Sequence, residues 1–273
     1  MKVRNLLPVL IFSFLTPSLR PAQHAVDPTQ ARLAITSHLA SLTRHDVESF
    51  FSEARSGNPE AQYWLALVYE EGRLVPKDMA QFESWLVKSA EQGFVSSEAN
   101  LGMVLKDKDR PASERWLHRA AEQGDPEAQF WLGVAYDDNW YGTTDAQLAA
   151  HWFEKAAAQG HPDAQASLGQ MYKDGRGVEQ NYAMAAEWFR KAAQHVPDLG
   201  GAGQGRNELG MLYIDGLGVP KDYVQAYMWF TLANNKDNCT YVEDQMTPAQ
   251  ISEARRMVEE WRKLHPTPEI PHF

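Results

Sequence analysis

The chain has 273 residues, of which 44% are hydrophobic and 23% charged, which excludes a disordered or fibrous composition. Its 36 acidic residues outnumber its 26 basic ones, and the formal net charge is −10. We therefore expect no nucleic-acid partner, because binding to phosphates requires a basic surface.

The first residues have the layout of a secretory signal peptide. Lys2 and Arg4 precede an apolar run from Leu6 to Leu15, and polar sequence follows. This run is too short to span a membrane. We therefore expect a signal peptide over residues 1–25 and a periplasmic or secreted protein without a transmembrane segment. An amphipathic start to the fold is the alternative. Cys239 is the only cysteine, so packing alone must hold the exported chain together.

Two signatures alternate along the middle of the chain, a leucine followed by a small residue and then a tryptophan. Self-similarity at a near-fixed period is typical of a solenoid, whose units cannot bury their apolar faces alone and stack on one another. The pairs are Leu65-Ala66, Leu101-Gly102, Leu132-Gly133, Leu168-Gly169 and Leu209-Gly210, and the tryptophans are Trp85, Trp116, Trp152, Trp188 and Trp229.

Each unit is expected to be a pair of helices. In the first helix, apolar residues at i, i+4, i+7 and i+8 form one stripe. Gly169 beside this stripe would weaken an isolated helix, so it indicates a close approach of another chain segment. Pro162 suits the first helical position, and Gly175 suits the turn to the second helix. The stripe consists of Ala164, Leu168, Met171 and Tyr172.

Capping helices are expected at both ends of the array. Thr43 is a candidate N-cap for a helix up to Gly57, and Thr247, followed by Pro248, is one for a helix up to Trp261. Residues 26–42 also have a helical pattern. The predicted segments are N-terminal capping helices over 26–57, repeats over 58–93, 94–124, 125–160, 161–204 and 205–240, and a C-terminal helix and tail over 241–273.

The motif A-x-x-x-L-G-x-x-Y-x-x-G-x-G-V, followed by A-x-x-W-[FY]-x-K-A-A-x-x-G, resembles the Sel1-like repeats, which are related to tetratricopeptide repeats. It is best kept over residues 164–193 and 209–232. The resemblance implies an all-α fold, a right-handed α/α solenoid of about five repeats that binds other proteins. It also implies a link to secreted adaptors and to immunity proteins against toxic phospholipase effectors.

No catalytic, cofactor or metal constellation stands out. The histidines, among them His118 and His161, do not recur at matching positions or at the helical spacing of a metal pair, so we expect them on the solvated surface. Residues 200–205 are rich in glycine but lack the Lys-Ser/Thr of a phosphate loop. They accompany the wider interval between Trp188 and Trp229, and an inserted flexible joint is the simpler explanation. We predict a protein that is not an enzyme.

Candidate partner-binding residues are those that the repeat itself does not require. Three columns of the first helices lie on one flank beside the buried stripe and should form a concave surface, with one acid per repeat along its edge. Alternatively, the acids bond to the following turns, and the tryptophans pack between repeats. The candidates in these columns are Trp64, Trp131, Asp138, Gln170, Asp174, Met211 and Asp215.

The third unit adds an irregular turn, Asn139-Trp140-Tyr141-Gly142, in place of Gly-x-Gly-Val. Exposed Trp and Tyr are preferred interface anchors, so Trp140 and Tyr141 are further candidates. The alternative is that they fill a gap left by the shortened second unit.

Three functions remain open. The leading hypothesis is a non-catalytic exported scaffold that grips a protein on its concave face. A narrower version is a periplasmic immunity protein that neutralises a toxic secreted effector. A third is a glycan- or peptidoglycan-binding module, in which Trp140 and Tyr141 would stack on sugar rings.

Overall fold

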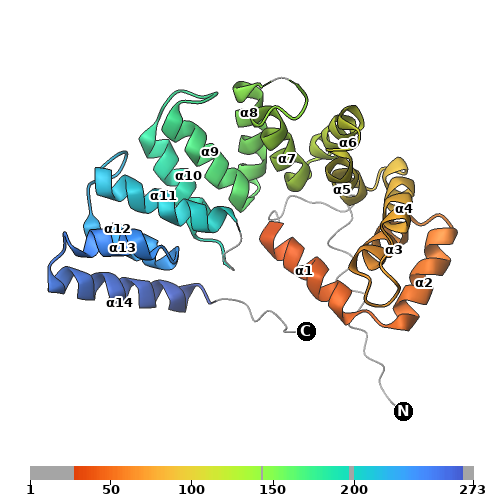
Figure 1. Cartoon of the computed structure of the whole chain (residues 1–273), viewed down its shortest axis with the longest axis horizontal. Helices are drawn as coiled ribbons and strands as arrows, with labels where there is room; N and C mark the ends of the chain where they lie inside the picture. Colours follow the sequence, from red (N-terminus) through yellow and green to blue (C-terminus); the bar gives the residue numbers. More distant parts are fainter. Residues whose placement is uncertain (1–27, 143, 197–199, 267–273) are drawn as a thin grey trace, which may run out of the picture.

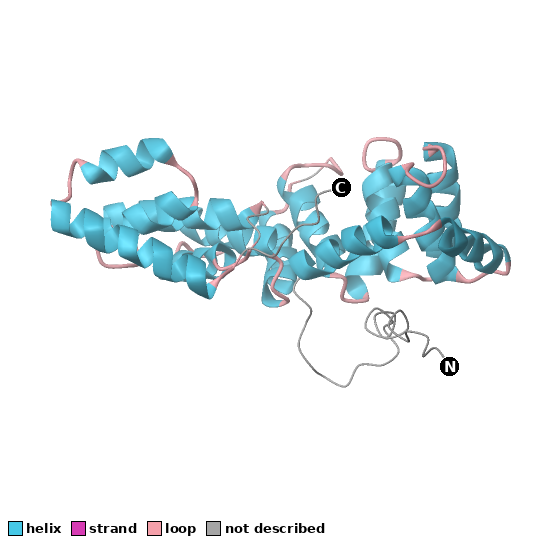
Figure 2. Ribbon diagram, turned by 90° about the horizontal axis from the view of Figure 1, so that it is seen from below, coloured by secondary structure: helices cyan, strands magenta, loops and turns pink. Residues whose placement is uncertain are grey.

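The computed structural model describes residues 28–142, 144–196 and 200–266, and in these ranges it contains only helices and their connecting loops (Figure 2). The predicted signal peptide, residues 1–25, lies outside the described residues. The helices pack in chain order and form an arch (Figure 1). They are α1 (Pro28–Ser41), α2 (Arg44–Arg55), α3 (Pro59–Glu71), α4 (Met79–Glu91), α5 (Val95–Leu105), α6 (Arg110–Glu122), α7 (Pro126–Asp137), α8 (Ala146–Ala158), α9 (Pro162–Asp174), α10 (Tyr182–Ala193), α11 (Gly201–Asp215), α12 (Tyr223–Leu232), α13 (Lys236–Glu243) and α14 (Pro248–Leu264).

The five predicted repeats correspond to the helix pairs α3–α4, α5–α6, α7–α8, α9–α10 and α11–α12. The first helices α9 and α11 also pack on each other, and α5 and α7 do so to a smaller extent. In Figure 1, α4, α6 and α8 lie on the outside of the arch, and α1 lies inside it. We call the surface formed by α3, α5, α7, α9 and α11 the inner face.

Side-chain caps determine where the helices begin. Thr43 and Thr247 each form a capping box, which confirms both predicted starts. Asp125 precedes a proline and accepts a 2.8 Å hydrogen bond from the Ala128 amide. The second helix of every repeat begins after an Asp or Asn whose side chain caps it in the same way. These caps are Asp78, Asp109, Asp145, Asn181 and Asp222.

His161 is the N-cap of α9 and is buried, so the prediction that it lies on the solvated surface was wrong. Only 1% of the side chain is exposed. Its Nδ1 accepts from the Ala164 amide at 3.3 Å, which requires the neutral tautomer with hydrogen on Nε2, and Nε2 lies 3.2 Å from the Glu127 carboxylate. The ring also stacks on Phe130, with centroids 4.7 Å apart. The imidazole therefore does for α9 what Asp125 does for α7.

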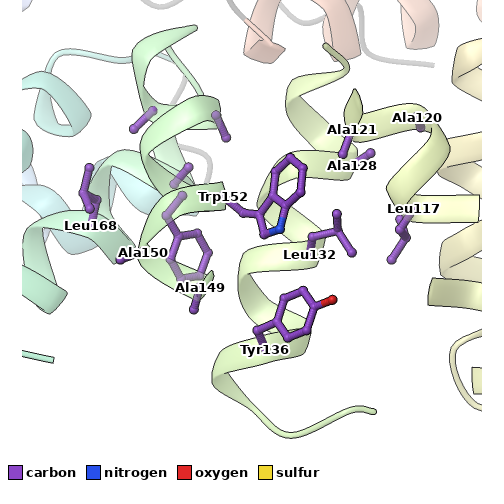
Figure 3. Packing of buried hydrophobic residues seen from close by; sticks show 14 of the residues in the cluster. Leu117, Ala120, Ala121, Ala128, Leu132, Tyr136, Ala149, Ala150, Trp152 and Leu168 are labelled. Carbon is purple, nitrogen blue, oxygen red and sulfur yellow. The ribbon is translucent and has the colours of Figure 1, made fainter. Parts of the chain in front are cut away.

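The apolar core runs without interruption from repeat to repeat. One cluster includes buried residues of α5, α6, α7, α8 and α9, and Figure 3 shows Trp152 of α8 directed between Leu132 of α7 and the alanines of α6 and α7. The repeat leucines are at most 1% exposed. This continuity confirms that neighbouring units bury one another's stripes. The leucines are Leu65, Leu101, Leu132, Leu168 and Leu209.

A polar column lies beside this core, three residues before each repeat leucine. Gln129 Nε2 donates to the Ala121 carbonyl at 3.0 Å, and its Oε1 accepts from Gln159 at 2.8 Å. Such satisfied buried amides fix the register between repeats, because a shift would leave polar groups unpaired. The column consists of Gln62, Glu98, Gln129, Gln165 and Arg206.

The glycine-rich segment is not a flexible joint, because it forms the first turns of α11. Gly201 and Gly205 are buried. A Cβ on Gly205 would lie 2.8 Å from the Ala192 Cβ, so glycine permits α11 to approach α10 closely. The Gly201 amide also donates to Asp163 Oδ1 at 2.8 Å. The glycines therefore serve packing between repeats four and five.

The array ends in helices that cover its last apolar surface. Ala254 and Val258 of α14 are buried, and α14 packs on α12. The Trp261 ring lies 5.0 Å from the guanidinium of Arg206, the last member of the polar column. α13 is a short helix that the sequence pattern did not predict.

Candidate protein-binding face

The inner face is hollowed between repeats four and five. A cavity of about 450 Å³ lies between the C-terminal halves of α9 and α11 and the turns that follow them. Met211 is 40% exposed there and Leu217 36%, although large apolar side chains are otherwise mostly covered. The cavity is lined by Lys173, Asp174, Gln180, Tyr182, Glu208, Met211, Leu212, Asp215 and Leu217.

Three of the residues predicted from the repeat columns meet at this cavity, namely Asp174, Met211 and Asp215. Gln170, one turn before Asp174, donates to its carboxylate at 2.8 Å. The four side chains thus belong to one local surface. Asp174 and Asp215 are the last residues of parallel helices, where the helix dipole already favours cations.

Lys173 and Glu208 link the two helices across the cavity. The Lys173 Nζ lies 2.6 Å from a Glu208 carboxylate oxygen, and both side chains are partly buried. Because these charges neutralise each other, Asp174 and Asp215 carry the remaining charge of the lining. Arg176 and Lys221 in the adjoining turns interact electrostatically with Asp174 and Asp215 respectively. The site is therefore weakly acidic and has an apolar centre.

Repeat three contributes a pair of stacked tryptophans, Trp131 and Trp140, to the same inner face. Trp131 and Trp140 stack with centroids 5.9 Å apart and planes at 28°. Lys106 lies over both rings, with Nζ 5.1 Å from the Trp140 centroid and 6.0 Å from that of Trp131. Both tryptophans are half-buried. Each keeps an accessible part, and Asp138 beside them is exposed at the end of α7.

Tyr141 does not join this tryptophan pair and packs toward the core. Its ring meets Tyr136 edge-on at 5.9 Å, and it packs against the core cluster of repeats two to four. Burial raises the pKa of the Tyr141 hydroxyl. This position fits the gap-filling alternative, so the two aromatics of the irregular turn have different surroundings.

Trp64, the first member of the tryptophan column, is covered. It is 4% exposed, and the His38 ring of α1 meets it edge-on at 4.6 Å. In this structure it is therefore not available to a partner. α1 contributes to this burial together with Tyr63. The helical pattern of residues 26–42 did not indicate that this helix would lie inside the arch.

Several residues of the site escaped the sequence argument. Lys106 and Lys173 occupy the same position of their repeats, five residues after the repeat leucine, but the other repeats have Glu70, Asp137 or Ile214 there. Tyr182 and Leu217 lie at a helix start and in a turn, where the repeat pattern does not define the residue type. A usable signal existed for one pair, since Lys173 and Glu208 lie at corresponding faces of neighbouring first helices. The repeat period could have placed them side by side.

The described residues outside this face were also considered as metal ligands, reactive thiols and membrane-spanning helices. Among the described residues, no group of three or more His, Cys, Asp and Glu side chains is arranged to hold a metal ion. Cys239 is a free, partly buried thiol whose pKa burial raises. Within the same residues, every helix is too short or too polar to cross a bilayer.

Comparison with solved structures gives three relatives of interest. The first, c5321, a protective antigen of uropathogenic Escherichia coli with an SLR fold, is 28% identical over 81% of this chain, with a TM-score of 0.53. This chain covers only 57% of that antigen. A Sel1 repeat protein from Oxalobacter formigenes is 25% identical over 79% of this chain and 88% of its own, with a TM-score of 0.60. Immunity protein Pa5087 from Pseudomonas aeruginosa is 20% identical over 81% of this chain and 85% of its own, with a TM-score of 0.47.

A search of curated proteins found no match. A sequence model of the Sel1 repeat, however, matches five segments that together span more than half of the chain. They are residues 59–94, 98–125, 126–161, 162–195 and 204–238, which agree with the helix pairs described above. The chain belongs to the Sel1 repeat family.

Proposed function

We propose that this protein is an exported, non-catalytic scaffold that binds a protein partner on the inner face of repeats three to five. The observation that carries the proposal is the cavity between α9 and α11. Asp174, Met211 and Asp215, which the repeat itself does not require, all line this cavity. Exposed apolar side chains within a polar rim are typical of interface centres.

The charge of the face favours a partner with basic side chains. Asp174 and Asp215 flank Met211, so a Lys or Arg with its aliphatic stem on Met211 and Leu217 would meet a carboxylate at its end. The overall charge of −10 would also steer such a partner toward the protein. Export rests on the basic start and apolar run of residues 2–15.

The test is partner capture from the envelope fraction, followed by affinity measurement with the captured protein. We expect Met211→Asp/Leu217→Asp to weaken binding by about 1–2 kcal/mol or more, roughly fivefold to thirtyfold, because it places charge in the apolar centre. Met79 and Leu264 are also exposed, at 49% and 77%, and lie in other parts of the chain. The matched control Met79→Asp/Leu264→Asp should bind as the unchanged protein does. Equal binding by both variants would refute the site.

The identity of the captured protein decides between the narrower functions. A toxic exported enzyme whose activity falls on binding would make this protein an immunity protein. Retention on peptidoglycan that depends on Trp140, without a protein partner, would favour the glycan-binding alternative and contradict the scaffold proposal.

A further inference from the structure

Helix α1 lies inside the arch, across the inner face of the first repeat (Figure 1). Ile35 and Leu39 pack against the cluster that includes Tyr63 and Trp64 of α3. Leu42, just beyond the helix, is 6% exposed and packs with Val47 and Val68. Ile35, Leu39 and Leu42 stand at i, i+4 and i+7, which is the spacing of a helix that binds in a groove.

The surface beneath α1 is aromatic. The Trp64 ring meets Tyr63 at 5.5 Å, and Tyr63 in turn meets Phe94, which precedes α5, at 5.3 Å. His38 of α1 lies edge-on to Trp64. α1 contributes to the burial of Trp64 on the inner face, whereas Trp131, in the corresponding position of repeat three, keeps an exposed part.

Arg73, in the turn after α3, holds the end of this helix. Its Nη2 donates to the carbonyl oxygens of Leu39 at 2.7 Å and Leu42 at 3.1 Å. Glu71 lies 3.5 Å from its Nε and restrains the guanidinium. The last carbonyls of a helix lack partners within it and carry partial negative charge, so a fixed cation recognises them.

The described side chains of α1 that contact the first repeat include Ile35, His38 and Leu39, and Arg73 holds the C-terminal end of the helix. Thr36, Ser37 and Ser41 on its remaining faces are exposed. In the described part of the chain, the two helices of each repeat pack more extensively on each other than α1 packs on α3. Segments with few buried contacts open at low free-energy cost. The helix can therefore leave while the repeats stay folded.

We propose that the inner face of α3, with Arg73, is a receptor for an amphipathic helix, and that α1 occupies it as a displaceable intramolecular ligand. The partner that takes its place carries a helix with aliphatic residues at i, i+4 and i+7 that ends beside Arg73. This proposal goes beyond the cavity of repeats four and five and does not depend on it, since each surface has its own test.

The experiment uses the full chain and, as its probe, a fluorescein-labelled synthetic peptide with the sequence of residues 28–42, followed by fluorescence anisotropy. Ile35→Asp/Leu39→Asp should release α1 and increase peptide affinity at least about tenfold over the unchanged protein, because the tethered helix no longer competes. Ser37→Asp/Ser41→Asp adds the same charge to the exposed face of α1 and should leave the affinity unchanged.

Arg73→Ala in the released variant should then weaken peptide binding about fivefold or more, whereas Arg115→Ala, on an exposed position of α6, should not. No peptide binding by a released variant that retains its helical circular dichroism, or equal binding by released and unchanged protein, would overturn the proposal. So would a dimer of the unchanged protein formed by exchange of α1, which would make a second copy the occupant.

Hydrogen exchange on the unchanged protein gives a measurement that needs no variant to fold. Amides of α1 should exchange at least about a hundredfold faster than those of α9, because α1 opens without unfolding of the array. Equal protection of the two helices would show that α1 is an integral part of the fold and would overturn its role as a displaceable ligand.

Discussion

The Phe189 ring of α10 packs directly against Gly169 of α9 and fills the space that a side chain at position 169 would need. A Cβ placed on Gly169 would lie 2.8 Å from the Cδ1 and Cε1 atoms of the Phe189 ring. Gly210 and Phe230 repeat the relationship at 2.7 Å. At the corresponding positions, repeat one has Ala66 and Leu86, and repeat two has Gly102 and Leu117. An alanine in the first helix is therefore found here only with the smaller leucine in the second.

We expect Gly169→Ala to lower the free energy of unfolding by about 1–3 kcal/mol, because the added methyl group displaces a fully buried ring. The gain in helix propensity, about 1 kcal/mol, offsets part of this cost. Urea denaturation followed by circular dichroism measures the change.

Phe189→Leu in the same chain should recover part of the loss, since the double variant recreates the Ala66–Leu86 pair of repeat one. The two changes would then be non-additive in a double-mutant cycle. Additive losses would show that the two positions are independent.

Asp125 predicts a pH dependence of stability. Burial raises its pKa to about 6 from 3.8, although the cap bond from Ala128 and His161 act in the opposite direction. The unfolded chain ionises first as pH rises, so this group makes the fold less stable between about pH 4 and pH 6 and keeps that effect at higher pH.

Asp125→Asn keeps the cap, as Asn58 does in repeat one, and removes the titration. Its stability relative to the unchanged protein should therefore increase from pH 4 to pH 7, measured by denaturation at each pH. Glu122→Gln, at an exposed site nearby, is the control and should show little change. A relative stability of Asp125→Asn that falls with rising pH would contradict the assignment.

We expect substitutions of Trp140 and Tyr141, the two aromatic residues of the irregular turn, to differ in their effect on stability. Tyr141→Ala removes a ring that packs in the core and should cost about 2–4 kcal/mol. Trp140→Ala removes a surface stack on Trp131 and the contact with Lys106, together about 1–2 kcal/mol. The unfolding temperatures of the two variants give the order of their stabilities. A larger loss of stability for Trp140→Ala than for Tyr141→Ala would contradict this assignment.

The repeat period was sufficient to predict most of the fold. The pair Leu168-Gly169 recurs in the other repeats as a leucine followed by a small residue. This recurrence predicted a helix with a buried stripe and a closely packed neighbouring helix. It likewise placed Asp174, Met211 and Asp215 on one flank, because helical geometry relates equal positions of stacked units.

What the period could not supply were contacts that depend on non-repeating residues. Gly201 and Gly205 have a loop-like composition, yet tertiary packing against α10 keeps them helical. His161 stands in the column of Asn58 and Asp125 and takes over their capping role, which its residue type alone did not suggest. The packing partner of residues 26–42 has no sequence signal, because Ile35, Leu39 and Leu42 indicate a stripe but not the surface it meets.

The most direct test of the binding face is site-specific photocrosslinking in cells. A photoreactive amino acid at Met211, in the cavity, should crosslink to a partner protein, whereas the same residue at Glu187, exposed on the second helix of repeat four, should not. A partner crosslinked from position 187 and absent from position 211 would contradict the account.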